Sequence, residues 1–540
     1  MSKLKSLYLI LAEFFAGVSV MAVEIGANRL LAPYFSSSQI VWTIIIGTIM
    51  IAMALGNVWG GRAADRDPDP SRLFRRMLVA AVWIAAIPAL GKYVIIGIAG
   101  LVIFTVSGNY LIWAALAACL VVFVFPLFLL GTTTPSLARY TMKNAADAGK
   151  AVGRLEAANT IGSILGTFLP TFVTIPAVGT SLTFIIFGAA LLILALIWLI
   201  PEALRSKKAR LYVLTAVCLV LFVVFSIFGR FDSFAFWEED LTYEGESVYN
   251  YLQVKESPRR VSLSTNVLFG VQSVAMKDGP GLTGLYYDTA LAAPLMTPGT
   301  DDLDVLILGN GTGTYAMQLR HYFPGCRIDA VEIDDRITAL AYEYFGLDKN
   351  DPDIAVFDGD GRAFINSCEK SYDVIMVDAY QDITIPFSMS SAEFFTLVRE
   401  HLNPGGAMVV NMNMRSGEGG INARLCDTMA SVFPTVMTVD VGGSTNREVF
   451  CSADPRDEVL ARCEANVSAV TDAALSTSLR MTYTWLEDYA PTGGGIFTDD
   501  RAPVELLGME ALDLIIGDEI SYYKDVYEES GITGLIDMLG

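Results

Sequence analysis

The sequence predicts a multi-span α-helical membrane domain joined to an α/β region, in which a small β domain precedes a doubly wound sheet. Three observations lead to this fold class. The mean hydropathy of +0.47 over 540 residues is too high for a purely soluble protein. The whole chain has a net charge of −21, but residues 1–230 carry 18 Lys and Arg against 8 Asp and Glu, whereas residues 231–540 carry 19 against 50. In the second half, short apolar strands alternate with helical segments and glycine turns.

Apolar stretches of about 20 residues, the length that crosses the hydrocarbon core of a bilayer, recur in the first half. The predicted spans are 7–33, 41–61, 77–98, 110–131, 155–176, 180–200 and 210–229. Clusters of Lys and Arg precede the first span and follow the second, fourth and sixth. Because cationic loops stay in the cytoplasm, we expect a multi-pass cell-membrane protein with a cytoplasmic N-terminus. With an odd number of spans, the C-terminal half is then extracytoplasmic.

Polar residues inside the first predicted span are candidates for a functional role in the membrane. Glu13 and Glu24 are eleven positions apart and so share a helix face, and Asn28 lies one turn further on. Buried carboxylates are costly in lipid and are functional candidates by default. The alternative is that they pair with Arg29 or a neighbouring helix and only hold the bundle together.

The composition sets the domain boundaries and excludes several classes of protein. We place the transmembrane domain at 1–230, a linker and small β domain at 231–300, and the doubly wound domain at 301–540. Seven cysteines without a CxxC pair, together with two histidines, do not form a zinc pattern, so no metal is expected. The acidic half repels nucleic acid and attracts a small cationic ligand.

The doubly wound domain follows from its alternation of strands and helices. Strands are predicted at 303–308, 328–333, 354–357, 374–377, 407–411, 435–440 and 447–451, and helices at 314–323 and 391–402. We predict short alternating strands of a small β domain at 247–276. In a mainly parallel sheet of this kind, ligands bind beyond the carboxyl ends of the strands.

Chemistry-bearing residues follow the strand ends in order. The turn after the first strand contains Gly309, Gly311 and Gly313, which let the backbone approach a ligand closely. Glu332 ends the second strand, where an acid accepts hydrogen bonds from ribose hydroxyls. Asp360 and Gly361 follow the third strand, and Asp378 ends the fourth. The combination predicts a nucleoside ligand.

Six segments carry a resemblance to a known family. They are Met21–Phe35, Gly284–Asp288, Val331–Asp334 with Asp360–Arg362, Val377–Tyr380 and Thr498–Glu505. With these segments the chain resembles the spermidine synthase family of aminopropyltransferases, which share the methyltransferase-like (Rossmann-like) fold. It is most similar to the bacterial membrane-fused spermidine synthase-like proteins.

The resemblance implies a reaction and a set of site residues. An aminopropyl group would pass from decarboxylated S-adenosylmethionine to a polyamine such as putrescine, with no metal. Glu332 would hold the ribose, Asp360 the adenine, and Asp378 the attacking amine and its proton, while Tyr287 would shape the cavity. The substrate side would include four further residues: Gln272, Asp288, Tyr380 and Asp382. The implied partners are membrane lipid and a small cationic amine, and the implied assembly is a homodimer.

The sequence also departs from the family pattern. Thr312 stands where the family has an aspartate for the donor's aminopropyl ammonium, and the acidic run after the fourth strand reads Asp378-Ala379-Tyr380-Gln381-Asp382. Two alternatives stay open for this reason. One is a methyltransferase that uses S-adenosylmethionine in the same pocket. The other is a polyamine transporter or sensor whose nucleoside- or polyamine-binding domain is not catalytic.

Overall fold

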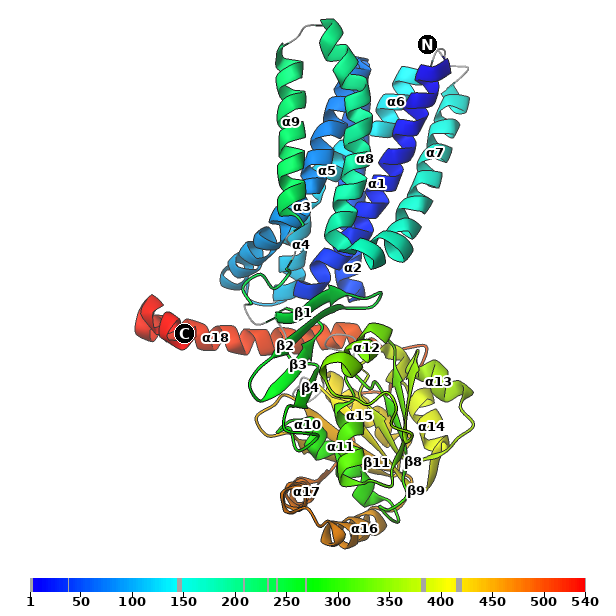
Figure 1. Ribbon diagram of the computed structural model, residues 1–540, viewed down its shortest axis with the longest axis vertical. Helices are drawn as coiled ribbons and strands as arrows, with labels where there is room; N and C mark the ends of the chain where they lie inside the picture. The colour runs from blue at the N-terminus through cyan, green and yellow to red at the C-terminus, as the bar shows by residue number, and fades with distance from the viewer. Residues whose placement is uncertain are drawn as a thin grey trace. The chain divides into compact units, whose positions relative to one another are not determined.

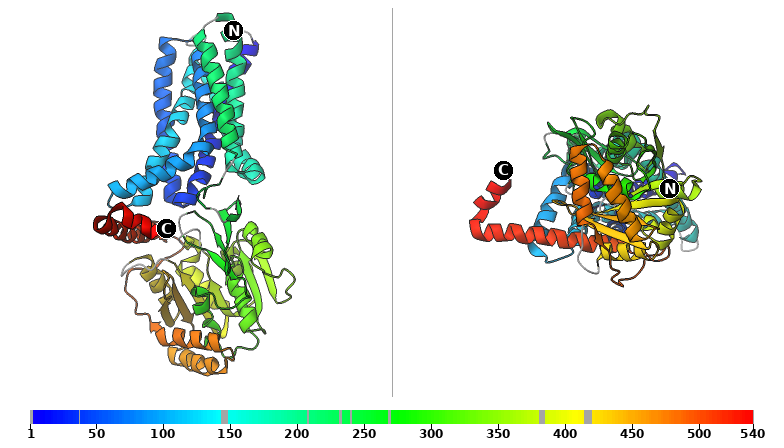
Figure 2. Two further views of the ribbon diagram at one scale, coloured as in Figure 1. Left: turned by 60° about the vertical axis from the view of Figure 1, so that its left-hand side comes forward. Right: turned by 90° about the horizontal axis from the view of Figure 1, so that it is seen from below.

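The chain forms two compact units, Met1–Glu239 and Asp240–Gly540. The computed structural model describes residues 3–36, 38–142, 148–206, 209–230, 233–238, 241–267, 270–379, 385–413 and 420–539. The first unit is a helical bundle, and the second contains two β-sheets surrounded by helices (Figures 1 and 2).

The helical unit consists of long apolar helices that run along one bundle (Figure 1). They are α1 (Lys3–Phe35), α2 (Gln39–Arg66), α3 (Pro70–Thr105), α4 (Tyr110–Val122), α5 (Val124–Gly131), α6 (Thr133–Thr141), α7 (Ala148–Leu169), the π-helical turn η2 (Pro170–Thr174), α8 (Ile175–Ser206) and α9 (Ala209–Phe228). Side-chain caps begin two of them. At the start of α2, the side chain of Ser38 accepts a hydrogen bond from Val41 N. At the start of α3, the side chain of Asp69 accepts one from Ser71 N.

The number of helices that could cross a membrane differs from the sequence prediction. By length and composition, five described helical stretches qualify, and α4 with α5–α6 makes a sixth if this bent pair is one span. The prediction was seven spans, with 155–176 and 180–200 as separate ones. The count differs because both fall within one continuous helical stretch of 59 residues, Ala148–Ser206, which is counted once. Its backbone breaks at Gly179, with φ of 80°, and the chain reverses direction between α7 and α8 (Figure 1). Glycine adopts this φ without a steric penalty, so no polar loop is needed.

One end of the bundle is strongly cationic. The Lys and Arg clusters lie at the N-terminal ends of α1, α3 and α7 and at the C-terminal ends of α2, α6 and α8, which gather at one end of the unit (Figure 1). Loop acids pair with some of these arginines, as Asp67 does with Arg72 and Asp65 with Arg139. Helix α9 begins at this end and runs to the opposite one (Figure 1).

The polar residues predicted in the first span lie in a closely packed part of the bundle. Glu13 is fully buried and accepts hydrogen bonds from Thr134 Oγ1 at 2.5 Å and Asn159 Nδ2 at 2.8 Å. These bonds join α1 to α6 and α7. Asn28 Oδ1 has no partner among the described residues, and Glu24 is half-buried. Any further role of Glu13, Glu24 and Asn28 stays a prediction.

Helices α1 and α7 touch backbone to backbone through two glycines of α7. A Cβ at Gly162 would lie 2.1 Å from Phe14 O, and a Cβ at Gly166 would lie 2.2 Å from Val18 O. Such distances are far inside van der Waals contact. Small residues four apart are the usual means of close helix contact in membrane proteins.

Gly162→Ala is therefore expected to destabilise the helical unit by about 1–3 kcal/mol, the usual effect of overpacking. The measurement is thermal unfolding of the full chain in detergent. Gly153→Ala is the matched control on the same helix, because a Cβ at Gly153 would meet no neighbouring atom within 4 Å, and alanine is a better helix former than glycine. Equal stability of the two variants would show that α1 and α7 are not in close contact.

The α/β unit begins with a small antiparallel sheet. Its strands are β1 (Leu241–Glu246), β2 (Tyr251–Glu256), β3 (Arg260–Ser264) and β4 (Ser273–Met276), in the order β1-β2-β3-β4. Apolar side chains of β2 and β3 pack against Ile337 and Leu340 of helix α12 (Asp335–Tyr344). The small sheet is thus attached to the larger one through α12.

The large sheet has eight strands in the order β12-β10-β11-β9-β8-β5-β6-β7. They are β5 (Asp304–Leu308), β6 (Arg327–Glu332), β7 (Ile354–Asp358), β8 (Tyr372–Val377), β9 (Leu402–Met412), β10 (Thr435–Asp440), β11 (Arg447–Ser452) and β12 (Glu487–Asp488). The five strands from β7 to β9 are parallel, and β11, β10 and β12 extend the sheet antiparallel. The winding reverses between β5 and β8, which is where a ligand is expected in such a sheet.

Helices cover both faces of this sheet. Alternate residues of β5 show the division, since Val305 and Ile307 belong to one core and Leu306 and Leu308 to the other. The first core includes α10 (Tyr286–Ala290), η3 (Ala293–Met296), α11 (Thr314–Tyr322), α16 (Arg456–Ala469) and α17 (Ala473–Trp485), the last two side by side in Figure 2. The second includes α13 (Gly361–Ser367), η4 (Phe387–Met389), α14 (Ala392–Glu400), α15 (Ile421–Ala430) and α18 (Val504–Leu539). This arrangement, a sheet between two layers of helices, is the predicted α/β class.

Two local predictions need correction. The helix predicted at 391–402 ends at Glu400, and β9, predicted at 407–411, begins at Leu402. Tyr372 N donates to His401 O, so the chain joins the sheet as soon as the helix ends. The long C-terminal helix α18 was not predicted.

Candidate active site

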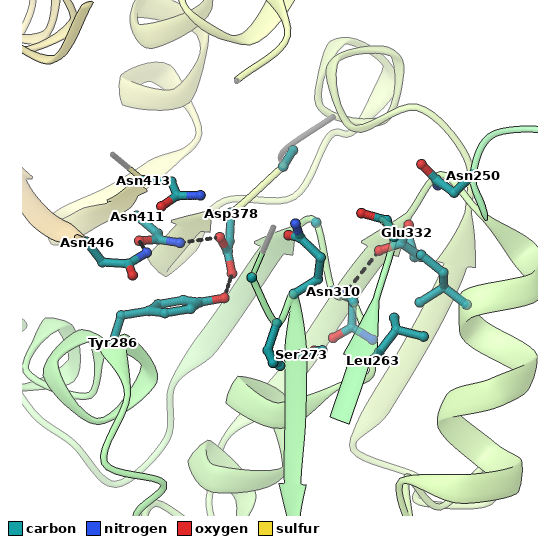
Figure 3. Close-up of a pocket in the computed structure, with 18 of the residues that line it drawn as sticks. Asn250, Leu263, Ser273, Tyr286, Asn310, Glu332, Asp378, Asn411, Asn413 and Asn446 are labelled. Atoms are coloured by element: carbon teal, nitrogen blue, oxygen red, sulfur yellow. Dashed lines mark hydrogen bonds between the residues drawn. The ribbon is translucent and has the colours of Figure 1, made fainter. Parts of the chain in front are cut away.

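The carboxyl ends of β5, β6 and β8 open into a cavity of about 880 Å³. Its walls include these strand ends, the small sheet, α10, the end of β9 and residues Leu512–Ile516 of α18. This volume is typical of small-molecule sites. Figure 3 shows the polar side chains that point into it.

The glycine turn after β5 forms the floor of the cavity. Gly309 has φ of 94°, and a Cβ there would lie 2.3 Å from Asp378 O, so only glycine fits. Gly311 has φ of 53°, and its N–H donates to Glu332 Oε2 at 2.8 Å. Gly309 and Gly311 line the cavity, whereas Gly313 packs beneath it against Leu347.

Glu332 ends β6 beside this turn. It is 7% exposed, and its Oε1 accepts the N–H of Asp334 at 3.1 Å. Burial raises the pKa of Glu332 to about 7, although the N–H groups of Asp334 and Gly311 oppose the shift. The carboxylate has further lone pairs on the cavity side, where it can accept hydrogen bonds from a vicinal diol.

Asp378 follows β8 and faces the same cavity. Its Oδ2 accepts the hydroxyl of Tyr286 at 2.6 Å, and its Oδ1 accepts Asn411 Nδ2 at 2.8 Å (Figure 3). Burial raises the pKa of Asp378 to about 7, against the opposing effect of these two bonds. A carboxyl with this pKa can take up or release a proton near neutral pH, as a general base must.

The partners of Asp378 were not assigned from the sequence. Burial, then the charge of Asp378, raises the pKa of Tyr286 well above its usual range, so its hydroxyl stays a donor. Asn411 Oδ1 in turn accepts Asn446 Nδ2 at 2.9 Å. The only sequence signal for these partners was the position of Tyr286 next to the assigned Tyr287. Asn411 and Asn446 belong to no motif.

Tyr287 and Gln272 line the cavity but bond each other and not Asp378. The hydroxyl of Tyr287 donates to Gln272 O at 3.0 Å and lies 3.4 Å from Ser273 Oγ. The ring of Tyr287 packs on that of Tyr286, with centroids 4.0 Å apart. This geometry fits the predicted role of Tyr287 in shaping the cavity.

The remaining predicted residues divide between the cavity and its support. Asp360 and Gly361 line the cavity, and Asp360 Oδ1 also caps α13 by accepting Ala363 N at 2.7 Å. Asp288 is buried away from the cavity lining, where it accepts the N–H groups of Thr283 and Gly284 and is a structural residue. The predictions for Tyr380 and Asp382 lie outside the described residues.

A further acid, Glu448, lies behind this site. It is the cross-strand partner of Asn411 and shares the sheet face of Phe450. It is fully buried, and neither carboxyl oxygen has a hydrogen-bond partner within the described ranges. Burial, then the charge of Asp378, raises the pKa of Glu448 well above its usual range. The group therefore keeps its proton in the folded chain.

Glu448→Met is expected to stabilise the α/β unit by about 1–3 kcal/mol near pH 8, because it removes an unpaired buried polar group. The pKa of Glu448 is higher in the folded state than in the unfolded state, where it is near 4.3. Its contribution to the free energy of unfolding is therefore fully present below the unfolded-state pKa and is lost as the pH rises toward the folded-state pKa. The gain should thus be larger at pH 8 than at pH 5 in thermal unfolding of the full chain. Glu448→Gln controls for shape and should flatten the same pH dependence. An unchanged pH dependence in both variants would mean that Glu448 is not held protonated.

Comparison with known proteins finds polyamine aminopropyltransferases and, over a shorter part of the chain, methyltransferases. Residues 286–441 match the family model of the spermine/spermidine synthase domain. A probable polyamine aminopropyl transferase of Bifidobacterium longum (strain NCC 2705) is 50% identical over 343 residues, which cover 59% of this chain and 74% of that protein. A polyamine aminopropyltransferase of Oceanobacillus iheyensis is 25% identical over 361 residues, covering 63% of this chain and 66% of that protein. A solved probable spermidine synthase from Corynebacterium glutamicum ATCC 13032 is 17% identical, with a TM-score of 0.39, over 48% of this chain and 98% of that one.

Proposed function

This chain belongs to the spermine/spermidine synthase family of aminopropyltransferases, and we propose that it moves an aminopropyl group from decarboxylated S-adenosylmethionine to a small polyamine such as putrescine while anchored in a membrane. The observation that carries the proposal is the pairing of Glu332 and Asp378 in one cavity. Both carboxyls line it, and both have a pKa of about 7.

The two carboxyls suit the two halves of the reaction. Glu332 accepts hydrogen bonds from the ribose hydroxyls of the donor, beside a glycine turn that lets the nucleoside approach the backbone. Asp378 attracts the ammonium group of the acceptor and takes its proton. An alkylammonium has a pKa near 10.4 and must lose that proton before it can attack.

In the transfer step, one bond forms, one bond breaks, and the total charge is unchanged. The neutral amine attacks the methylene carbon next to the sulfonium, a C–N bond forms, and the C–S bond breaks. The electron pair of that bond returns to sulfur, so methylthioadenosine leaves as a neutral thioether. The positive charge of the sulfonium ends on the new secondary ammonium. Because no anion accumulates on the leaving group, the reaction requires no Lewis acid.

Membrane anchoring and sidedness rest on the helical unit. Large apolar side chains are exposed on its helices, such as Leu101 at 64%, Phe172 at 68% and Val220 at 61%, as expected of a surface in contact with lipid. The cationic end of the bundle would face the cytoplasm. The α/β unit follows α9, whose last turn lies at the other end, and would therefore be extracytoplasmic.

The proposed reaction is tested on the full chain purified in detergent. We expect labelled spermidine from putrescine and aminopropyl-labelled decarboxylated S-adenosylmethionine. Methylated product from methyl-labelled S-adenosylmethionine, with none from the decarboxylated donor, would identify a methyltransferase instead. Saturable binding of putrescine without product from either donor would favour a transporter or sensor.

Sidedness needs a separate experiment, because activity in detergent does not report it. Protease added to sealed right-side-out membrane vesicles should digest the α/β unit, and inverted vesicles should protect it. The reverse result would place the α/β unit in the cytoplasm and would leave the proposed chemistry unaffected.

A further inference from the structure

Asn310, the second residue of the glycine turn, has a polar side chain with no partner in the described part of the protein. Only 7% of the residue is exposed, and neither Oδ1 nor Nδ2 forms a hydrogen bond with any described residue. Its backbone is fixed, because the N–H donates to Val331 O at 3.0 Å and the carbonyl accepts Gly313 N at 2.9 Å. A buried amide without partners is unfavourable. Such a group in a ligand cavity points to the ligand as its partner.

The position of Asn310 shows which part of a ligand it would meet. The residue lines the cavity, and its amide projects from the turn between Glu332 on one side and Asp378 on the other (Figure 3). The hydroxyl of Thr312 is also buried and has no described partner, but Thr312 is not part of the cavity lining. If the ribose lies at Glu332 and the attacking amine at Asp378, the sulfonium and its methylene carbon lie in the space that Asn310 faces.

The chemistry of the attack leaves a role for one more acceptor. After the ammonium loses a proton, the amine has two N–H groups and one lone pair, and the lone pair must point at the methylene carbon. Both oxygens of Asp378 already accept a protein hydrogen bond, from Tyr286 and from Asn411. A hydrogen bond to Asp378 fixes the amine at one point. The amine can still rotate about this bond, which would turn its lone pair away from the methylene carbon. A second acceptor fixes the rotation.

We propose that Asn310 is a second anchor for the attacking amine: once Asp378 has taken the proton, Asn310 Oδ1 accepts one N–H of the neutral amine and Asp378 the other, so that the lone pair points at the methylene carbon of the donor. This inference rests on the proposed function, since it assumes an amine at Asp378 and a nucleoside at Glu332.

The test compares Asn310→Leu, which keeps the size but removes both polar atoms, with Asn310→Asp, which keeps an acceptor. Single-turnover rates are measured at pH 8.5 with saturating decarboxylated S-adenosylmethionine and varied putrescine. Calorimetry with methylthioadenosine, which lacks the reacting carbon chain, reports on the nucleoside site and the folding of the turn. Asn366→Leu is the matched control, an exposed asparagine of α13 outside the cavity lining.

We expect Asn310→Leu to lower kcat/KM for putrescine by about 10- to 100-fold, the value of one hydrogen bond to a charged or partly charged group. Methylthioadenosine affinity should stay within about twofold, and Asn310→Asp should lose clearly less activity than Asn310→Leu. Asn366→Leu should behave as the unmodified chain.

Three outcomes would overturn the inference while the proposed function stands. They are a rate for Asn310→Leu within about twofold of the unmodified chain, equal losses in the Leu and Asp variants, and a loss of methylthioadenosine binding in parallel with the rate. The last would show that Asn310 holds the nucleoside or the turn. A different result, no aminopropyl product from the unmodified chain, would refute the proposed function itself.

Discussion

Asp378→Asn is expected to lower the rate of aminopropyl transfer by about 10²- to 10⁴-fold, the usual contribution of a general base. Asparagine has the same shape and can still accept the hydroxyl of Tyr286, but it cannot take a proton from the acceptor ammonium. Single-turnover rates with saturating donor and putrescine measure the effect. Methylthioadenosine should bind as before, because the proposed nucleoside site consists of the glycine turn and Glu332.

The companion variant Tyr286→Phe tests the same role through the pH profile. The hydroxyl of Tyr286 donates to Asp378 and lowers the pKa of that carboxyl. Its removal should raise the pKa of Asp378, so the rise of activity with pH should move to higher pH. The assigned role of Asp378 would be refuted if Asp378→Asn kept more than a tenth of the rate.

Glu332→Gln is expected to weaken the binding of methylthioadenosine by about 10- to 100-fold. Hydrogen bonds to a charged group contribute about 1.5–3 kcal/mol, and glutamine replaces the carboxylate by a neutral amide. The variant keeps one oxygen, which can accept the N–H of Gly311, whereas the N–H of Asp334 loses its acceptor. Calorimetric titration of the full chain gives the affinity directly.

Glu343→Gln provides the matched control for charge, since Glu343 is exposed on α12 and does not line the cavity. Its affinity for methylthioadenosine should equal that of the unmodified chain. If Glu332→Gln changed the affinity by less than threefold, the ribose would not be held by Glu332, and the nucleoside would have to bind in another orientation.

The parts of the site that follow from local sequence were predictable. Strands β5, β6 and β8 are short apolar runs, and each ends at a residue that cannot continue it, which places the glycine turn, Glu332 and Asp378 at one sheet edge. The order of these segments in the chain was enough, because parallel strands bring their carboxyl ends together.

Other parts depend on contacts that the sequence does not encode locally. Which of the two tyrosines, Tyr286 or Tyr287, donates to Asp378 is set by the orientation of α10. This helix has five residues and is too short for its sequence to show a helical periodicity. Asn411 and Glu448 meet only through the register of β9 and β11. The boundary between the predicted spans 155–176 and 180–200 falls at the backbone break of Gly179, but the sequence did not show that the helical stretch continues without a polar loop.

The two carboxyls with a pKa near 7 have a consequence for how ligand binding is measured. Near neutral pH the free cavity is a mixture of protonation states at Glu332 and Asp378. A sulfonium or ammonium ligand favours the ionised forms, so its entry expels protons into the buffer. The heat of a calorimetric titration then contains the heat of buffer protonation and changes from one buffer to another. Apparent affinity for cationic ligands rises with pH through the neutral range, by up to about tenfold per pH unit for each proton released.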